Sequence, residues 1–144
     1  MQKIQPFHLA IPVHHLESAR SFYRDTLGCE EGRSSDHWVD INFFGHQLVI
    51  HLKESAVEGV ADAGSNPVDG KEVPIPHFGV VLEWQVFLDF AKKLEEKQID
   101  FVIVPYIRFE GQVGEQATMF FKDGCGNSLE MKSFRHPEHI FTKL

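Results

Sequence analysis

The chain has 144 residues, 42% of them hydrophobic and thirteen of them Phe, which suffices for one compact domain or two small fused modules. Its formal net charge of −7 argues against a general nucleic-acid binder, which normally carries a basic face. No apolar run approaches the roughly 18 residues of a membrane span, and we expect no secretory leader and no membrane partner. Cys29 and Cys125 lack metal or redox spacing, so we expect reduced thiols in a cytoplasmic protein.

The first half predicts a strand, a helix and three further strands. The stretch FHLAIPV at residues 7–13 predicts a short apolar strand. A helix is predicted over residues 16–27, and Gly28 would end it, because apolar side chains recur there at helical spacing. Further strands are predicted over residues 29–34, 37–43 and 46–53, with a tight turn at Phe44-Gly45-His46.

Residues 54–74 lose this periodicity. The stretch ESAVEGVADAGSNPVDGKEVP carries three Gly, two Pro and several charges, which indicates a linker or a long excursion over the surface. A structureless segment of this length is unusual inside a compact domain and is often functional, for instance as a lid.

The second half repeats the plan of the first. Strands are predicted over residues 76–84, 100–107, 117–123 and 128–134, with a helix over residues 84–97. We therefore expect a first module at residues 1–53, a linker at 54–74, a second module at 75–134 and a C-terminal tail at 135–144. Pro6-Phe7-His8 is echoed by Pro76-His77-Phe78, an internal repeat of about 69 residues.

Ligand-type side chains recur at matching places in this repeated plan. Side chains alternate across a strand, so one face of each strand is apolar, and the other carries His8, His51, His77 or Glu130 beside small or polar neighbours. An ionised Glu or an unpaired His is costly to bury, and a divalent cation would remove that cost. Two imidazoles and one carboxylate suit Fe(II), Mn(II), Zn(II) or Ni(II). The alternative is that each His is an ordinary core or surface residue.

The chain resembles the vicinal oxygen chelate superfamily, which includes glyoxalase I, extradiol dioxygenases and bleomycin-resistance proteins. The resembling segments cover most of the chain apart from the linker and the tail: FHLAIPVHHLESARSFYRDTLG, HQLVIHL, PHFGVVL and ATMFFKDGCGNSLEMKSF. The resemblance implies an α+β fold in which two tandem βαβββ modules form a cupped mixed sheet around a metal site.

By position, the resemblance assigns His8, His77 and Glu130 as metal ligands. It places His51 at a fourth-strand position that holds a ligand in glyoxalase I and an acid–base His in extradiol dioxygenases. We expect His51 to be the catalytic proton shuttle, with a fourth-ligand role as the alternative. Fe(II) is the favoured cofactor.

The expected function is that of a dioxygenase-like enzyme acting on a small aromatic substrate chelated through vicinal oxygens. Alternatives are a glyoxalase-like isomerase or lyase, and a protein that sequesters a drug or metabolite. Phe120 stands where dioxygenases usually carry Tyr, which counts against standard ring cleavage. His37, Arg108 and Phe120 are candidate substrate contacts, although packing or solvent exposure would also explain them. The resemblance also implies a homodimer.

Overall fold

The computed structural model describes residues 3–59 and 63–143. The chain divides into two compact units, the first made of residues 1–62 and 123–127, the second of residues 63–122 and 128–144. The expected boundary at residue 53 therefore lies inside the first unit. Residues 1–2, 60–62 and 144, which belong to the expected first module, linker and tail, lie outside the described residues.

The first unit contains one four-stranded sheet and one helical segment. Its elements in chain order are β1 (His8–Val13), α1 (Leu16–Arg20), the π-helical turn η1 (Ser21–Thr26), β2 (Glu30–Ser34), β3 (Trp38–Phe43) and β4 (His46–Leu52). The strand order is β1-β4-β3-β2, and β1 runs parallel to β4 while the other neighbours are antiparallel. This is the predicted strand–helix–three-strand plan.

The helical segment of this unit is shorter as an α-helix than the pattern predicts. The Nδ1 atom of His15 accepts from the Ser18 amide at 3.1 Å and caps α1. From Ser21 the chain continues as a π-helical turn, in which the Leu27 amide donates to the Phe22 carbonyl five residues back. The buried residues of the segment still follow the predicted apolar face: Ala19, Tyr23 and Leu27.

The turn at residues 123–127 belongs to the first unit. Asp123 is fully buried and accepts hydrogen bonds from the Tyr23 hydroxyl at 2.8 Å and from the Cys125 and Asn127 amides. The Asn127 amide group donates to the Pro12 carbonyl at 2.9 Å. These bonds satisfy the buried carboxylate and hold the turn against β1 and η1.

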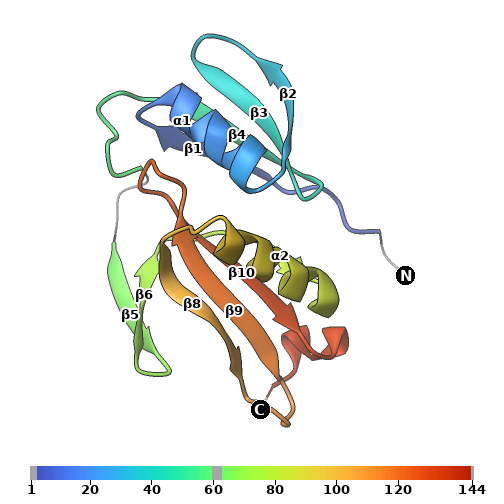
Figure 1. Ribbon diagram of the computed structural model, residues 1–144. Coiled ribbons are helices and arrows are strands. Elements are labelled where there is room, and N and C mark those ends of the chain that lie inside the picture. Colours follow the sequence, from blue (N-terminus) through green and yellow to red (C-terminus); the bar gives the residue numbers. More distant parts are fainter. Residues whose placement is uncertain (1–2, 60–62, 144) are drawn as a thin grey trace. The chain divides into compact units, whose positions relative to one another are not determined.

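The second unit contains a second four-stranded sheet and a hairpin. Its elements are β5 (Gly64–Val68), β6 (Lys71–Ile75), β7 (Val81–Leu82), α2 (Trp84–Glu96), β8 (Phe101–Arg108), β9 (Gln116–Lys122), β10 (Ser128–Phe134) and the 3₁₀ turn η2 (Pro137–Phe141). The strand order β7-β10-β9-β8 matches that of the first unit, and β7 is parallel to β10. Figure 1 shows α2 lying along this sheet, where Phe87, Ala91 and Leu94 are buried.

The second unit departs from expectation at its first strand. A strand was predicted over residues 76–84, but only Val81–Leu82 form one, with an isolated parallel bridge between Phe78 and Leu129. Gly79 approaches the backbone of Glu130 so closely that an added Cβ would lie 1.5 Å from the Glu130 carbonyl oxygen. Pro76 has no amide hydrogen to donate. The ladder is therefore interrupted where the two strands come closest.

The expected linker is also more ordered than predicted. Strands β5 and β6 form a hairpin whose turn residues Asp69 and Gly70 both have positive φ, as a type I′ turn requires. The Asp-Gly pair was a hairpin signal, but the flanking residues lack the apolar alternation of a half-buried strand. The expected tail contains η2.

The mixed sheets with few helices confirm the α+β class and the two four-stranded modules. Within the described residues, no helix is both long and apolar enough to cross a membrane.

Candidate metal centre

His77 and Glu130, two of the three predicted ligands, meet in the second unit. His77 lies just before β7, and Glu130 lies on β10, one residue beyond the partner of Phe78. Nε2 of His77 is 3.0 Å from Oε2 of Glu130. The His77 side chain is 27% exposed and that of Glu130 is 15% exposed, so both are shielded but reachable from solvent.

Both side chains are held by further hydrogen bonds. Nδ1 of His77 donates to the Pro74 carbonyl at 2.7 Å, which fixes a proton on Nδ1 and turns Nε2 toward the carboxylate. Oε1 of Glu130 accepts from the Thr118 hydroxyl at 2.7 Å. Metal-binding imidazoles and carboxylates are usually oriented in this way by a second layer of hydrogen bonds.

The pair perturbs the acid–base properties of both groups. The hydrogen bond to Glu130 raises the pKa of His77 above its usual value, although burial acts in the other direction. Burial opposes ionisation of Glu130, but hydrogen bonds from His77 and Thr118 outweigh it and lower the pKa of that carboxyl. At neutral pH Glu130 is therefore an ionised, ligand-competent carboxylate.

An apolar wall lies beside the pair. The ring of Phe120 meets that of His77 edge to face, with centroids 5.1 Å apart. Phe120 is buried in a cluster with Val73 of β6 and Ile103 of β8, and Val68 and Tyr106 pack against it. Phe120 therefore forms an apolar wall beside His77, and the hairpin β5–β6 supplies part of the same wall. Its role as a substrate contact stays a prediction.

The donor set of the pair fits a divalent ion. Metal–nitrogen and metal–oxygen bonds of about 2.0–2.2 Å put two ligands at right angles on one ion about 3 Å apart. The 3.0 Å separation of Nε2 and Oε2 matches this spacing. The same distance also suits a hydrogen bond between the two side chains.

His8, the third predicted ligand, lies in the first unit. It begins β1, is exposed, and its Nδ1 is 2.8 Å from the carboxamide oxygen of Gln47. That oxygen can only accept, so the bond requires the proton on Nδ1 and leaves a lone pair on Nε2. His8 is therefore not a buried core residue, and its ring is oriented as a ligand would be.

His51 lies on the same face of the first sheet as His8 but further along. In the β1–β4 ladder His8 pairs with Gln47, and Pro12 pairs with His51. Four residues along a strand span about 13 Å, so His8 and His51 of one unit do not reach a common ion. His51 is exposed, and its role as proton shuttle stays a prediction.

The other two predicted substrate contacts lie in different units. The backbone amide of His37 donates to the Ser35 hydroxyl at 3.1 Å, and the exposed His37 precedes β3. Arg108 forms an ion pair with Asp69 of the hairpin turn, and the Tyr106 hydroxyl donates to the same carboxylate at 3.0 Å. Arg108 thus ties β8 to the hairpin.

Among residues 3–59 and 63–143, no three His, Cys, Asp or Glu side chains gather as a metal site would require. The second unit supplies two of the predicted ligands, and the first unit supplies His8. The complete set of three stays a prediction.

Three supporting residues were not assigned from the sequence: Gln47, Thr118 and Lys132. Each lies on the ligand-bearing face of its strand, which alternation alone could have shown. Their contacts depend on the pairing register, which the sequence does not display.

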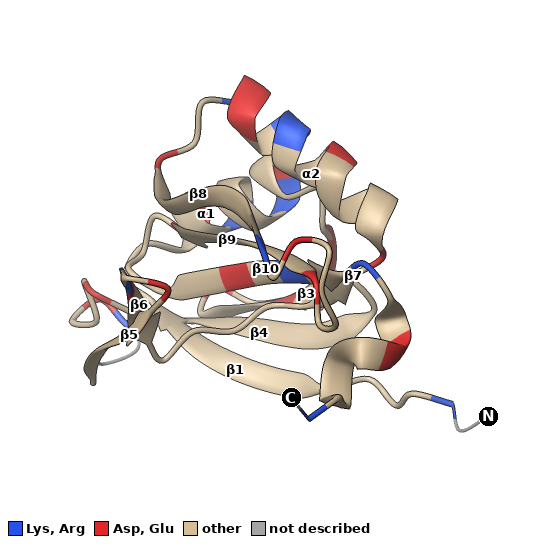
Figure 2. Cartoon of the chain, turned by 90° about the horizontal axis from the view of Figure 1, so that it is seen from below, with Lys and Arg blue, Asp and Glu red and all other residues tan. Residues whose placement is uncertain are grey.

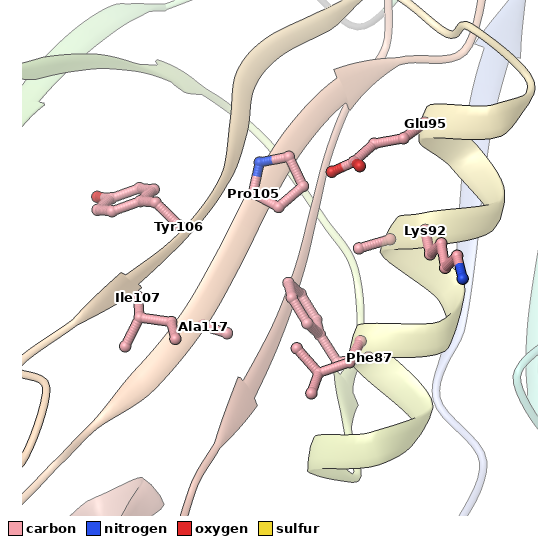
Figure 3. Close-up of a pocket in the computed structure, with 9 residues that line it drawn as sticks. Phe87, Lys92, Glu95, Pro105, Tyr106, Ile107 and Ala117 are labelled. Atoms are coloured by element: carbon pink, nitrogen blue, oxygen red, sulfur yellow. The ribbon is translucent and has the colours of Figure 1, made fainter.

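A separate cavity of about 250 Å³ lies on the helix side of the second unit. Phe87, Lys92 and Glu95 of α2 and Pro105 and Ile107 of β8 line it. In Figure 3 Glu95 extends toward Pro105, whereas the Lys92 ammonium points away from β8. The Tyr106 phenol points away from α2 in this view, as its bond to Asp69 requires. None of the predicted ligands lines this cavity.

Comparison with known proteins places these features in a family. The model of the glyoxalase/bleomycin resistance protein/dioxygenase superfamily matches residues 5–131. No curated protein matches the chain. A glyoxalase/bleomycin resistance protein/dioxygenase from Alicyclobacillus acidocaldarius is 31% identical, with a TM-score of 0.73 over 95% of this chain and 96% of that one.

Two more distant solved structures share the fold. A glyoxalase/dioxygenase from Nostoc punctiforme is 16% identical, with a TM-score of 0.65 over 92% of each chain. Lactoylglutathione lyase from Agrobacterium tumefaciens is 18% identical, with a TM-score of 0.62 over 92% of this chain and 96% of that one. Together with the paired four-stranded sheets, the family match shows that this chain belongs to the glyoxalase/bleomycin resistance protein/dioxygenase superfamily.

Proposed function

We propose that the protein is a metal-dependent, dioxygenase-like enzyme that acts on a small aromatic substrate bound through two neighbouring oxygen atoms. The observation that carries the proposal is the His77–Glu130 pair. Nε2 of His77 and Oε2 of Glu130 are 3.0 Å apart. His77 is oriented by a hydrogen bond to the Pro74 carbonyl, and Glu130 by one from the Thr118 hydroxyl. An ordinary surface ion pair has no need of that second layer.

The proposed ligands are His8, His77 and Glu130. Two imidazoles and one carboxylate form the ligand type of non-haem Fe(II) oxygenases, so Fe(II) is favoured, with Mn(II), Zn(II) and Ni(II) as alternatives. The ion would supply Lewis-acid stabilisation of negative charge on the chelated oxygens.

The protein's own residues would position and shield the substrate. Phe120 and the apolar cluster around it exclude water from one side of the pair. Thr118 and the Pro74 carbonyl keep the two ligands in place. His51, on β4, is the proposed proton-transfer group, because imidazole is the side chain that enzymes use most often as a general acid or base.

The proposed assembly is a homodimer, and the proposed location is the cytoplasm. The edge strand β8 exposes Val102, Val104 and Ile107, an apolar row that a partner copy would cover. Sedimentation equilibrium should give twice the 16.5 kDa mass of one chain. Cys29 and Cys125 are both unpaired thiols, which suits a reducing compartment.

Metal content tests the proposal directly. Protein purified without chelator or a His tag should hold about one Fe or Mn per chain by elemental analysis. Glu130→Ala should lose it, because the only carboxylate of the set is gone, while the solvent-exposed control Glu96→Ala should keep it. The iron-loaded protein should consume O₂ with catechols.

The outcomes separate the alternatives. Full metal occupancy in Glu130→Ala would refute the ligand assignment. Stoichiometric Zn or Ni without O₂ consumption would indicate isomerase or lyase chemistry instead. Tight binding of an aromatic compound without metal or turnover would indicate a sequestering protein.

A further inference from the structure

Lys132 lies beside the His77–Glu130 pair. It follows Glu130 by two residues on β10, so both side chains lie on one face of the sheet. Its Nζ is 3.8 Å from Oε1 of Glu130, and its side chain is 29% exposed. Figure 2 shows this alternation of an acidic and a basic stretch along β10.

The other cations on this side of the unit are more firmly engaged. Arg108 contacts both carboxylate oxygens of Asp69. The ammonium of Lys71 lies 4.3 Å from the centre of the Tyr106 ring, whereas that of Lys132 lies 5.6 Å from the centre of the Phe134 ring. The contact of Lys132 with Glu130 is longer than a hydrogen bond, and Glu130 already accepts from Thr118 and His77. Lys132 is therefore the cation that can be recruited by a ligand.

A bound metal ion would make Lys132 more available to a ligand. A divalent ion held by His77 and Glu130 would neutralise the carboxylate charge that now attracts the Lys132 ammonium. One carboxylate against an ammonium and a divalent ion leaves a local excess of positive charge. An anionic ligand would neutralise it.

Gln116 is a second, independent indication that a polar ligand binds near Lys132. It is 8% exposed, and its Oε1 has no hydrogen-bond partner among the described residues. In the antiparallel ladder Gln116 pairs with Phe134 and Thr118 pairs with Lys132, so Gln116 is a diagonal neighbour of Lys132 on the same face. A buried acceptor without a partner is costly, and a hydroxyl of a bound ligand would satisfy it.

We propose that Lys132 binds an anionic substituent of the substrate, so that the substrate class is a hydroxylated aromatic carboxylate. This inference rests on the proposed function, since the same substrate would chelate at His77 and Glu130. The backbone positions of Glu130 and Lys132 are about 7 Å apart, although Nζ now lies 3.8 Å from Oε1 of Glu130. A Lys132 side chain drawn away from Glu130 could therefore meet a carboxylate at the far end of a six-membered ring whose oxygens chelate at the pair. The apolar wall around Phe120 suits the ring.

Two matched probes test the inference. The probes are 3,4-dihydroxybenzoate and 4-methylcatechol, which differ in a carboxylate against a methyl group. Calorimetric titration of the protein as purified, under argon to prevent turnover, should show about tenfold tighter binding of the carboxylate. Lys132→Met should abolish that preference and Lys132→Arg should keep most of it. The control Lys93→Met, on exposed helix surface, should leave it unchanged.

The failures are distinguishable. Equal affinities in the native protein, or a preference that survives Lys132→Met, overturn the role of Lys132 and leave chelation of 4-methylcatechol standing. If neither probe binds, the proposed function fails, and benzoate titrated into EDTA-treated, ¹⁵N-labelled protein decides the inference. Shifts of the Lys132 and Gln116 amide resonances that are absent in Lys132→Met would support it, and unmoved resonances would overturn it.

Discussion

The two units share a strand order, but they differ in how their first strand pairs with the neighbouring strand and in which side chain its histidine contacts. In the first unit, β1 forms a continuous six-residue ladder with β4, and His8 meets the neutral carboxamide of Gln47. In the second unit, the equivalent ladder is broken around Gly79, and His77 meets the ionised carboxylate of Glu130.

The difference concerns local register as well as residue type. His8 contacts the residue directly opposite it, whereas His77 contacts the residue two positions beyond the one opposite it. The same two-residue step in the first unit leads to Val49, a buried apolar residue. The repeat therefore duplicates the sheet but not the charged pair. If the proposed ligand set is right, the second unit contributes an oriented pair and the first unit contributes one oriented imidazole.

The largest effect is expected from adding a side chain at Gly79, where the backbone lies closest to Glu130. In Gly79→Ala the new Cβ would meet the Glu130 carbonyl oxygen, which is backbone and cannot swing aside. We expect a loss of about 3 kcal/mol or more in the free energy of unfolding, measured by urea denaturation, because the strands must separate. Ala10 occupies the matching place in β1, one residue beyond the bridged Leu9.

Ala10 provides the control for that comparison. Ala10→Gly should cost about 1 kcal/mol or less, the usual price of a glycine in a strand. Similar small losses at both positions would show that the close approach of Gly79 to Glu130 is not a real difference between the units.

A smaller effect is expected at Gln47. Gln47→Leu removes the acceptor that holds the Nδ1 proton of His8, so His8 would lose its preferred orientation. Loss of such a supporting bond typically weakens metal binding about tenfold or more. Competition against a metal-sensitive dye would measure it, with Gln85→Leu on α2 as the control. Unchanged affinity would show that Gln47 does not orient a ligand.

Sequence patterns predicted the repeated plan because alternation and helical spacing are local properties. They did not predict the broken strand at residues 76–84. That break arises where Gly79 meets the backbone of Glu130, and the closeness of a strand so distant in sequence cannot be read from a local pattern. The β5–β6 hairpin lacks apolar alternation because most of its residues are exposed, and only Asp69-Gly70 signalled it.

In the candidate site, too, local patterns predicted some features, and contacts between distant strands determine the others. Alternation placed His77 and Glu130 on ligand-bearing faces, but their 3.0 Å contact follows from the register of strands separated by about fifty residues. Alternation placed His8 and His51 on the same face of the first sheet, but the register places Pro12, not His8, opposite His51. That offset along the strands cannot be read from the sequence.

The smallest predicted effect is the pH dependence of the free energy of unfolding that the His77–Glu130 pair contributes in chelator-treated protein. The raised pKa of His77 gives stability that is full below its unfolded value of 6.5 and is lost as the pH rises through the folded value. The lowered pKa of Glu130 gives stability that is present above 4.5 and is lost as the pH falls through the folded value. The pair should therefore contribute most between pH 4.5 and 6.5.

Glu130→Gln makes the second pair resemble the first, an imidazole beside a carboxamide. Near pH 5.5 we expect it to lower the free energy of unfolding by about 1–2 kcal/mol, the size of a hydrogen bond to a charged group. The gap should narrow toward pH 9, where neutral His77 no longer gains from the carboxylate. Urea denaturation across this range, beside the exposed control Glu96→Gln, measures the gap. If the difference in free energy of unfolding between the native protein and Glu130→Gln did not change with pH, both units would hold their histidines by equivalent neutral hydrogen bonds. The close approach at Gly79 would then be the remaining difference between the two units.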